Sequence, residues 1–240
     1  MKGALYQNMP PQATPRKAKP PFQKPETKGL TSDAYNRIKE MLYQQELVPG
    51  QKIIYEDLAK AFGMSTTPII NALSRLEQDG LVVLKYNRGY FITEISEKEA
   101  EDLLEARQTL EEYSIKKLID NYGEKKIEFL EDLLKKLKEY RPSSYTKKRL
   151  FQDASFHVGI AEMSGNQIVK ELLNFIYERI YLRYRTERFP LMRMDEADRE
   201  HTLLLNAIKR RDRQAALNRL NEHFLGVKKN ISLIIRREGE

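Results

Sequence analysis

The chain has 240 residues, of which 40% are hydrophobic and 32% charged, with a formal net charge of +7 and no cysteine. This length suits one large or two modest domains, and the lack of cysteine excludes disulfides and thiolate metal sites. No apolar run approaches the roughly 20 residues that cross a bilayer, and the N-terminus lacks the apolar core of a secretory signal. We therefore expect a cytoplasmic protein that has no membrane partner.

Residues 1–29 differ from the rest of the chain in composition. They hold six Lys or Arg against one acid, Glu26, and six of the ten prolines. A charged, proline-rich stretch with few aliphatic side chains cannot bury a core, so residues 1–29 are predicted to form a disordered basic tail. Such a tail either adds weak phosphate contacts or is a dispensable extension.

Residues 30–95 carry helix signals followed by a hairpin signal. The order helix, helix, turn, helix, hairpin is that of a winged helix-turn-helix domain. Apolar residues at helical spacing, capping residues and glycine stops set the expected bounds. The expected elements are a helix capped by Ser32 and Asp33, a short helix from Glu56 to Gly63, a helix from Ser65 to Gly80, and strands at 81–85 and 90–93.

The third of these helices would enter the major groove of DNA, where Asn and Thr read base edges. Cations on the hairpin, the wing, would meet phosphate or the minor groove. The alternative is a winged helix used only for protein contacts, because the near-neutral charge of this segment weakens the usual electrostatic signature. The candidate DNA contacts are Ser65, Thr66, Thr67, Ile70 and Asn71 on the helix and Lys85, Arg88 and Gly89 on the wing.

Residues 96–240 show helical periodicity and no strand-like alternation. Ser96 and Glu99 form a capping box at the start of the first helix. Six helices with short connections predict an all-α antiparallel bundle, so the fold class is mainly α. The first helix begins after Ser96, and the other five are expected near 124–140, 147–164, 167–188, 195–210 and 212–236.

The chain has only three histidines, and each lies near the inward face of a different predicted helix of this bundle. His157, His201 and His223 could therefore meet at its centre. Asp153 precedes His157 by four residues and shares its helix face. This pattern suits a divalent metal site, but it equally suits buried core histidines beside a surface aspartate.

The run PGQKIIYEDLAKAFGMSTTPIINALSRLEQDGLVVLKYNRGYF resembles the DNA-binding domain of GntR-type bacterial transcription regulators. The resemblance implies a dimer that binds double-stranded operator DNA. The family usually has Arg after the serine of the recognition helix, and Arg-Glu two residues after its proline. Thr66, Ile70 and Asn71 stand at those positions, which implies an unusual operator or a weaker affinity. The matching residues include Leu58-Ala59, Ser65-x-Thr67-Pro68, Ala72-Leu73-x-x-Leu76, Gly80-Leu81 and Gly89.

The second segment is similar to the FCD effector domain of the FadR-like subfamily of these regulators. The resemblance implies that Asp153, His157, His201 and His223 bind a divalent metal ion, zinc or nickel, and that a small carboxylate effector binds at the metal. The motifs that carry it are Arg107-x-x-Leu110-Glu111, Asp153-x-x-Phe156-His157, Ser164-Gly165-Asn166, Glu200-His201 and His223.

Two further residues are candidates for the effector pocket. Arg107 could grip the far end of a carboxylate, or it could form an ion pair with Glu111. Asn166 could line the pocket, or it could cap a helix end after Gly165.

The run YERIYLRYRTERF at 177–189 mixes four arginines with three tyrosines. Some of Arg183, Arg185 and Arg188 could reach the pocket, but a solvated face is the preferred interpretation. An RNA-binding patch would need exposed rings, whereas Tyr177, Tyr181 and Tyr184 are expected to pack inward.

These observations together predict a ligand-responsive, metal-containing transcription regulator that binds a pseudo-palindromic operator as a homodimer. One alternative is a metal-dependent, hydrolase-like enzyme whose winged helix is a docking module. The sequence argues against it, because no general base can be placed beside the metal. A second alternative is a regulator with a metal-free apolar effector in the bundle.

Overall fold

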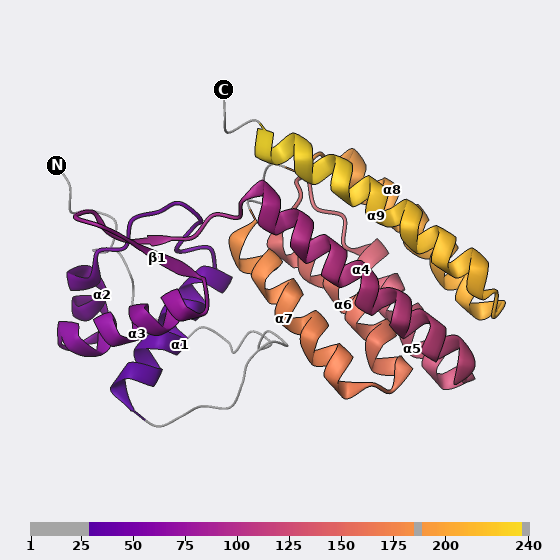
Figure 1. Ribbon diagram of the computed structural model, residues 1–240, viewed down its shortest axis with the longest axis horizontal. Coiled ribbons are helices and arrows are strands. Elements are labelled where there is room, and N and C mark those ends of the chain that lie inside the picture. The colour runs from indigo at the N-terminus through magenta and orange to yellow at the C-terminus, as the bar shows by residue number, and fades with distance from the viewer. Residues whose placement is uncertain (1–28, 185–188, 237–240) are drawn as a thin grey trace. The chain divides into compact units, whose positions relative to one another are not determined.

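The structure is a computed structural model that describes residues 29–184 and 189–236, with side chains as far as Ile231. The predicted tail, apart from Gly29, lies outside the described residues. The chain divides into two compact units, and the boundary along the chain lies between Glu94 and Ile95. Figure 1 shows a small hairpin beside the helices of the first unit and a bundle of helices in the second. None of the helices described is long and apolar enough to cross a membrane.

The first unit is the predicted winged helix-turn-helix. Its two strands pair antiparallel, with Val82 opposite Ile92 and Lys85 opposite Gly89. Lys52 forms an isolated antiparallel bridge to Phe91, which adds a short third segment to the sheet. The elements are α1 (Leu30–Tyr43), α2 (Tyr55–Phe62), α3 (Thr66–Gln78), β1 (Val82–Lys85) and β2 (Gly89–Ile92).

Helix α1 packs against α3, and their inward residues form the core of this unit. Ile38, Leu73 and Leu76 are fully buried. Gly63 ends α2 in the left-handed conformation at φ 66°, where a glycine has no Cβ to strain the turn. The core therefore fixes the angle at which α3 is presented.

The predicted cap of α1 by Ser32 and Asp33 is wrong. The helix begins earlier, at Leu30, with Gly29 at the cap position and no side-chain cap bond. The N–H of Asp33 bonds instead to the carbonyl of Gly29 at 2.9 Å. Ser32 serves another contact, because its Oγ accepts a hydrogen bond from Arg75 of α3 at 3.2 Å. Asp33 lies within the first turn, where its charge favours the helix dipole.

The second unit is an all-α bundle, as predicted. Figure 1 shows its long helices lying side by side. Helix α6 packs against α4, α5 and α7, while α9 packs against α4 and α8. The helices are α4 (Glu97–Asp120), α5 (Glu124–Glu139), α6 (Lys147–Ser164), α7 (Gln167–Arg183), α8 (Met192–Lys209) and α9 (Arg213–Arg236).

Helix α6 runs through the middle of the bundle and is largely buried. Small residues let its neighbours approach closely. A Cβ added at Gly159 would lie 2.5 Å from Cδ1 of Leu133 on α5. Helix α6 therefore places the side chains of Asp153 and His157 in the centre of the bundle.

Helix boundaries in this unit differ from the predicted ones by more than one residue at two places. Helix α8 begins at Met192, three residues before the predicted start, because the N–H groups of Arg193 and Met194 bond to the carbonyls of Pro190 and Leu191. Helix α7 ends at Arg183, and residues 185–188 of its predicted range lie outside the described residues.

The capping box of α4 forms in part. Ser96 Oγ accepts the N–H of Glu99 at 3.2 Å, as predicted. The carboxylate of Glu99 binds Arg183 at the end of α7, with Nη2 at 2.7 Å from Oε2. Glu99 therefore ties the start of α4 to the end of α7.

Candidate metal centre

Three histidines from three helices converge in the centre of the second unit. His157 comes from α6, His201 from α8 and His223 from α9, and all three are buried. Their ring centroids are 4.7 to 5.0 Å apart. Each ring offers one nitrogen to a group whose ligand atoms lie within 4.8 Å of one another. The bundle therefore brings together the three imidazoles that the sequence predicted to meet.

Two of these rings are oriented by carboxylates. Nδ1 of His157 lies 2.7 Å from Oε2 of Glu111, and Nδ1 of His223 lies 2.7 Å from Oε2 of Glu200. A carboxylate at Nδ1 favours the tautomer whose Nε2 carries a free lone pair. The Nε2 atoms of His157 and His201 face each other at 3.0 Å. This arrangement presents lone pairs to one point, as a metal site requires.

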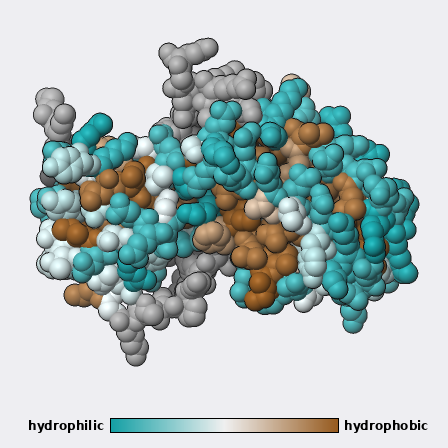
Figure 2. Space-filling view, in the orientation of Figure 1, coloured by the Kyte–Doolittle hydropathy of each residue, from teal (hydrophilic) through white to brown (hydrophobic). Residues whose placement is uncertain are grey.

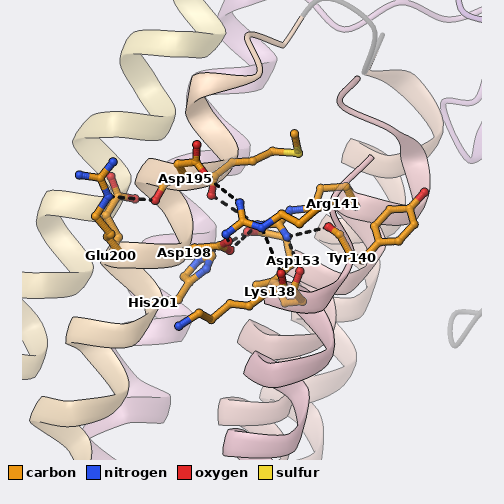
Figure 3. A network of polar contacts seen from close by, with 12 residues as sticks. Lys138, Tyr140, Arg141, Asp153, Asp195, Asp198, Glu200 and His201 are labelled. Atoms are coloured by element: carbon orange, nitrogen blue, oxygen red, sulfur yellow. Dashed lines mark hydrogen bonds and ion pairs between the residues drawn. The ribbon is translucent and has the colours of Figure 1, made fainter. Parts of the chain in front are cut away.

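Asp153 lies at the edge of the histidine group. Asp153 lies on α6, one helical turn before His157. Its Oδ1 is 3.4 Å from Nε2 of His201. Figure 3 shows Asp153 and His201 close together beside a polar network. The tight group of ligand atoms contains the three histidines, with the Asp153 carboxylate next to it.

Arg107 forms the ion pair with Glu111 that was one of the two roles the sequence left open. Its Nε donates to Oε1 of Glu111 at 2.6 Å, and its Nη2 lies 3.4 Å from Nε2 of His223. The guanidinium lies between two aromatic rings, 4.6 Å from the centroid of Tyr177 and 4.7 Å from that of Phe224. Arg107 is thus an ion-pair partner of Glu111 and also the cation that faces the histidines.

The two orienting carboxylates are held ionised. Burial alone would raise the pKa of Glu111, but Arg107 and His157 outweigh it and lower that pKa well below its ordinary range. Burial also opposes the ionisation of Glu200, yet hydrogen bonds from His223 and Arg193 lower its pKa to about 2. Both groups are acceptors at neutral pH, which is the form that orients a histidine.

The histidines of α8 and α9 are held neutral. Burial is the largest cause that lowers the pKa of His201 well below its usual value, and the positive charges around it add to the effect. Burial also lowers the pKa of His223 to about 4, although its bond to Glu200 works in the opposite direction. Neutral imidazole is the form that binds a metal ion.

Arg193 supports Glu200 from the first turn of α8. Its two Nη atoms each donate to one carboxylate oxygen at 2.7 Å. Helix α9 makes room for this pair with Gly226, where a Cβ would lie 3.1 Å from Oε1 of Glu200 and 3.2 Å from Nη1 of Arg193. Sequence reasoning missed Arg193. Its spacing of seven residues from Glu200 places both on one helix face, but the predicted helix began at residue 195, after Arg193.

A polar network continues from this site (Figure 3). Asp198 lies one turn before His201 on α8 and pairs with Arg141, at 2.7 Å, and with the buried Arg149. Arg149 also donates to the carbonyl of Leu137 at the end of α5. These bonds connect α5, α6 and α8 on the side of the site that carries Asp153.

Asn166 has the second of its two predicted roles. It occupies the cap position of α7, and its Oδ1 accepts the N–H groups of Ile168 and Val169 at 3.1 and 3.2 Å. Its Nδ2 donates to the hydroxyl of Tyr113 at 3.0 Å.

The arginine-tyrosine run packs largely inward. Tyr177 and Tyr184 are buried and Tyr181 is half-buried, as expected. Arg183 is buried too and pairs with Glu99, whereas the preferred interpretation had made it part of a solvated face. Arg185 and Arg188 lie outside the described residues.

The candidate DNA contacts lie on the surface of the first unit. Ser65, Thr67, Ile70 and Asn71 are exposed along α3, and Thr66 is half-buried. On the wing, Lys85 and Arg88 are exposed and flank the hairpin turn before Gly89, whose φ is 88°. The winged helix therefore presents this predicted set on its outer surface.

Comparison with known proteins assigns both units. A family model described as "FCD domain" matches residues 102–226, and one described as "Bacterial regulatory proteins, gntR family" matches residues 30–92. An uncharacterized HTH-type transcriptional regulator of Bacillus subtilis, YdhC, is 27% identical over 195 residues, which are 79% of this chain and 85% of that protein. The HTH-type transcriptional regulator McbR of Escherichia coli is 24% identical over 196 residues, which are 81% of this chain and 89% of that protein.

A solved structure agrees in fold. The chain matches Escherichia coli McbR/YncC with a TM-score of 0.66 and 23% identity, over 88% of this chain and all of that chain. Both relatives named above are described as HTH-type transcriptional regulators. The chain belongs to the GntR family of bacterial transcription regulators, with an FCD domain as its second unit.

Proposed function

We propose that this regulator holds a divalent metal ion between His157, His201 and His223, with Asp153 as an oxygen ligand. The observation that carries the proposal is the convergence of three buried imidazoles, two of them oriented by ionised carboxylates. Nitrogen donors with one carboxylate suit Zn²⁺ or Ni²⁺. The bound ion would act as a Lewis acid that anchors an anionic ligand.

The effector that we propose is a small carboxylate at this metal. Three carboxylates, Asp153, Glu111 and Glu200, stand against the two guanidiniums of Arg107 and Arg193 in the buried site. A divalent ion would leave the group with one positive charge, which one carboxylate would neutralise. Arg107 faces the site from α4 and can donate to that carboxylate.

The regulator would act on operator DNA from the cytoplasm as a homodimer. Two recognition helices related by a two-fold axis would read the halves of a pseudo-palindrome, using the exposed residues of α3 and the wing. An apolar face of α7 supports self-association. Figure 2 shows apolar side chains gathered over this helix. The face consists of Ile168, Leu172 and Phe175, which are 63%, 47% and 53% exposed.

Effector binding must favour one of two placements of the DNA-binding unit, because a ligand with equal affinity for both would shift nothing. Helix α4 would connect the effector site directly to the DNA-binding unit. It carries Arg107 at the site and begins at Glu97, just after the winged helix.

Thermal unfolding against small mono-, di- and hydroxycarboxylates tests this function, with metal-loaded and chelated protein compared. A ligand that binds the native state stabilises it by about 2.7 kcal/mol at a hundredfold excess over its Kd. We expect a stabilisation by one carboxylate class that disappears on chelation and returns with Zn²⁺ or Ni²⁺. A metal-independent shift with apolar compounds would instead support a metal-free effector.

A further inference from the structure

The described residues of the recognition helix include one cation, and that cation is engaged by α1. The single cation of α3 is Arg75, which turns toward α1: its guanidinium lies 4.7 Å from the ring centroid of Tyr35 and bonds to Ser32. Apart from Arg75, the exposed positions of the helix are hydroxyl, amide and aliphatic side chains. Cation contacts with phosphate supply most of the sequence-independent affinity for DNA. In this chain those contacts must come from elsewhere.

Three cations gather on one face of the wing. Paired residues of antiparallel strands share a face, and so do residues two apart along a strand. Phe91 pairs with Val83 and bridges to Lys52, while Lys85 pairs with Gly89. Lys52, Lys85 and Phe91 therefore lie on the same face, opposite to the buried Val82 and Ile92.

Phe91 is the centre of this group. Nζ of Lys85 lies 4.7 Å from its ring centroid and Cζ of Arg88 lies 5.6 Å away. Cε of Lys52 lies 3.7 Å from the position of a Cβ at Gly89, and the backbone of Lys52 bridges to that of Phe91. An aromatic ring attracts cations and covers their aliphatic stems, so it limits their motion while the charges stay in water.

The backbone fixes the three cations relative to one another. The N–H of Arg88 bonds to the carbonyl of Lys85 at 2.9 Å and closes the turn. The N–H of Ile53 bonds to the carbonyl of Tyr90 at 2.8 Å and holds the Lys52 segment against β2. In the described part of this unit, none of the three cations forms an ion pair with a carboxylate, so their charges remain available.

We propose that Lys52, Lys85 and Arg88, gathered around Phe91, are the main phosphate clamp of this regulator. The wing then carries the salt-dependent part of the DNA affinity, and α3 contributes base contacts without charge. Lys52 is a DNA contact that neither the sequence motifs nor the recognition helix indicate. The inference rests on the proposed function, in which the winged helix binds DNA directly.

Salt-dependent binding of the full-length chain to a short, fluorescein-labelled, mixed-sequence DNA duplex tests the clamp. Each lost phosphate contact lowers the slope of log K against log salt concentration by about 0.9. We expect the triple variant Lys52→Ala, Lys85→Ala and Arg88→Ala to lose about 2.7 from the slope. The matched control removes three exposed charges from the second unit, at Lys117, Lys125 and Lys135, and should keep the slope of the unaltered chain.

A second pair of variants tests Phe91 as the residue that positions the cations. Phe91→Leu removes the ring, and Phe91→Tyr keeps it. We expect weaker binding of the duplex only with leucine, at equal thermal stability of the two variants. Equal weakening by both would contradict the positioning role, because tyrosine keeps the ring.

The outcomes separate the clamp from the function on which it rests. An unaltered slope in the wing variant, equal to that of the control, would overturn the clamp. The clamp would also be overturned if the slope were lost only on neutralising the cations at 16, 17, 19, 24 and 28. Failure of the unaltered chain to bind duplex DNA at any salt concentration would overturn direct DNA binding itself.

Discussion

At the residue scale, Glu200 decides how His223 faces the other histidines. Its Oε2 lies 2.7 Å from Nδ1 of His223, and Arg193 holds both of its oxygens. We predict that Glu200→Gln lowers the affinity for Zn²⁺ by about 10- to 100-fold, as is typical when such an orienting carboxylate is lost. Competition with a coloured chelator measures this affinity.

Glu196→Gln is the matched control for that substitution. Glu196 also lies on α8 and approaches Arg193, at 3.6 Å, but no described bond joins it to a histidine. Its substitution should leave the affinity unchanged. A similar loss in both variants would assign the effect to the charge of Arg193 and not to the orientation of His223.

The buried histidines also give the metal-free protein a defined pH dependence. Burial lowers the pKa of His223 to about 4, from 6.5 in the unfolded chain. Between these values the unfolded chain binds more protons, so stability rises with pH and is lost as the pH falls. We predict that chelated protein loses free energy of unfolding in urea from about pH 7 to about pH 5, and that His223→Gln makes this loss smaller. An identical pH dependence in the variant would contradict the assignment.

The meeting of the three histidines could be predicted from the sequence, but not every residue that supports them could. His157, His201 and His223 recur at inward helical positions, which periodicity reveals. Arg193 could not be assigned a role, because its partner depends on the helix start at Met192 and on the space beside Gly226. These are properties of packing between helices, and one sequence does not record them.

At the element scale, the contact between α5 and α6 depends on Gly159. A Cβ there would lie 2.5 Å from Leu133 Cδ1. We predict that Gly159→Ala destabilises the protein by about 1–3 kcal/mol through overpacking, although alanine favours helices. Urea unfolding measures the change.

Gly123→Ala is the control for Gly159. A Cβ at Gly123 would meet only the flexible side chain of Lys126, at 3.8 Å, and its backbone conformation is extended. Gly123 is the N-cap of α5, where alanine is a poorer cap than glycine, so the loss should stay below about 1 kcal/mol. A loss at Gly123 as large as that at Gly159 would show that the overpacking argument is wrong.

Helix identity was easier to predict than helix ends. Apolar residues at helical spacing located every helix that the structure describes in both units. The start of α1 was misplaced because Ser32 bonds to Arg75 of α3 and does not cap its own helix. The start of α8 was misplaced because the carbonyls of Pro190 and Leu191 accept the first N–H groups. No side-chain cap marks this start in the sequence.

At the scale of the whole molecule, the apolar face of α7 should set the oligomeric state. We predict that Leu172→Glu converts a dimer into a monomer, because a charge would enter the interface between two copies. Light scattering after size-exclusion chromatography measures the mass. Leu225→Glu, on the 62%-exposed Leu225 of α9, should leave the dimer intact. Dissociation by Leu225→Glu alone would place the interface on α9.

Titration of Zn²⁺ into chelated full-length protein, followed by calorimetry, tests the metal centre most directly. The arrangement of His157, His201 and His223 predicts that each chain takes up a single ion and that His201→Gln, in folded protein, binds it far more weakly. Folded protein that takes up neither Zn²⁺ nor Ni²⁺, or a variant that binds as tightly as the original, would contradict the central claim that these histidines form a metal site.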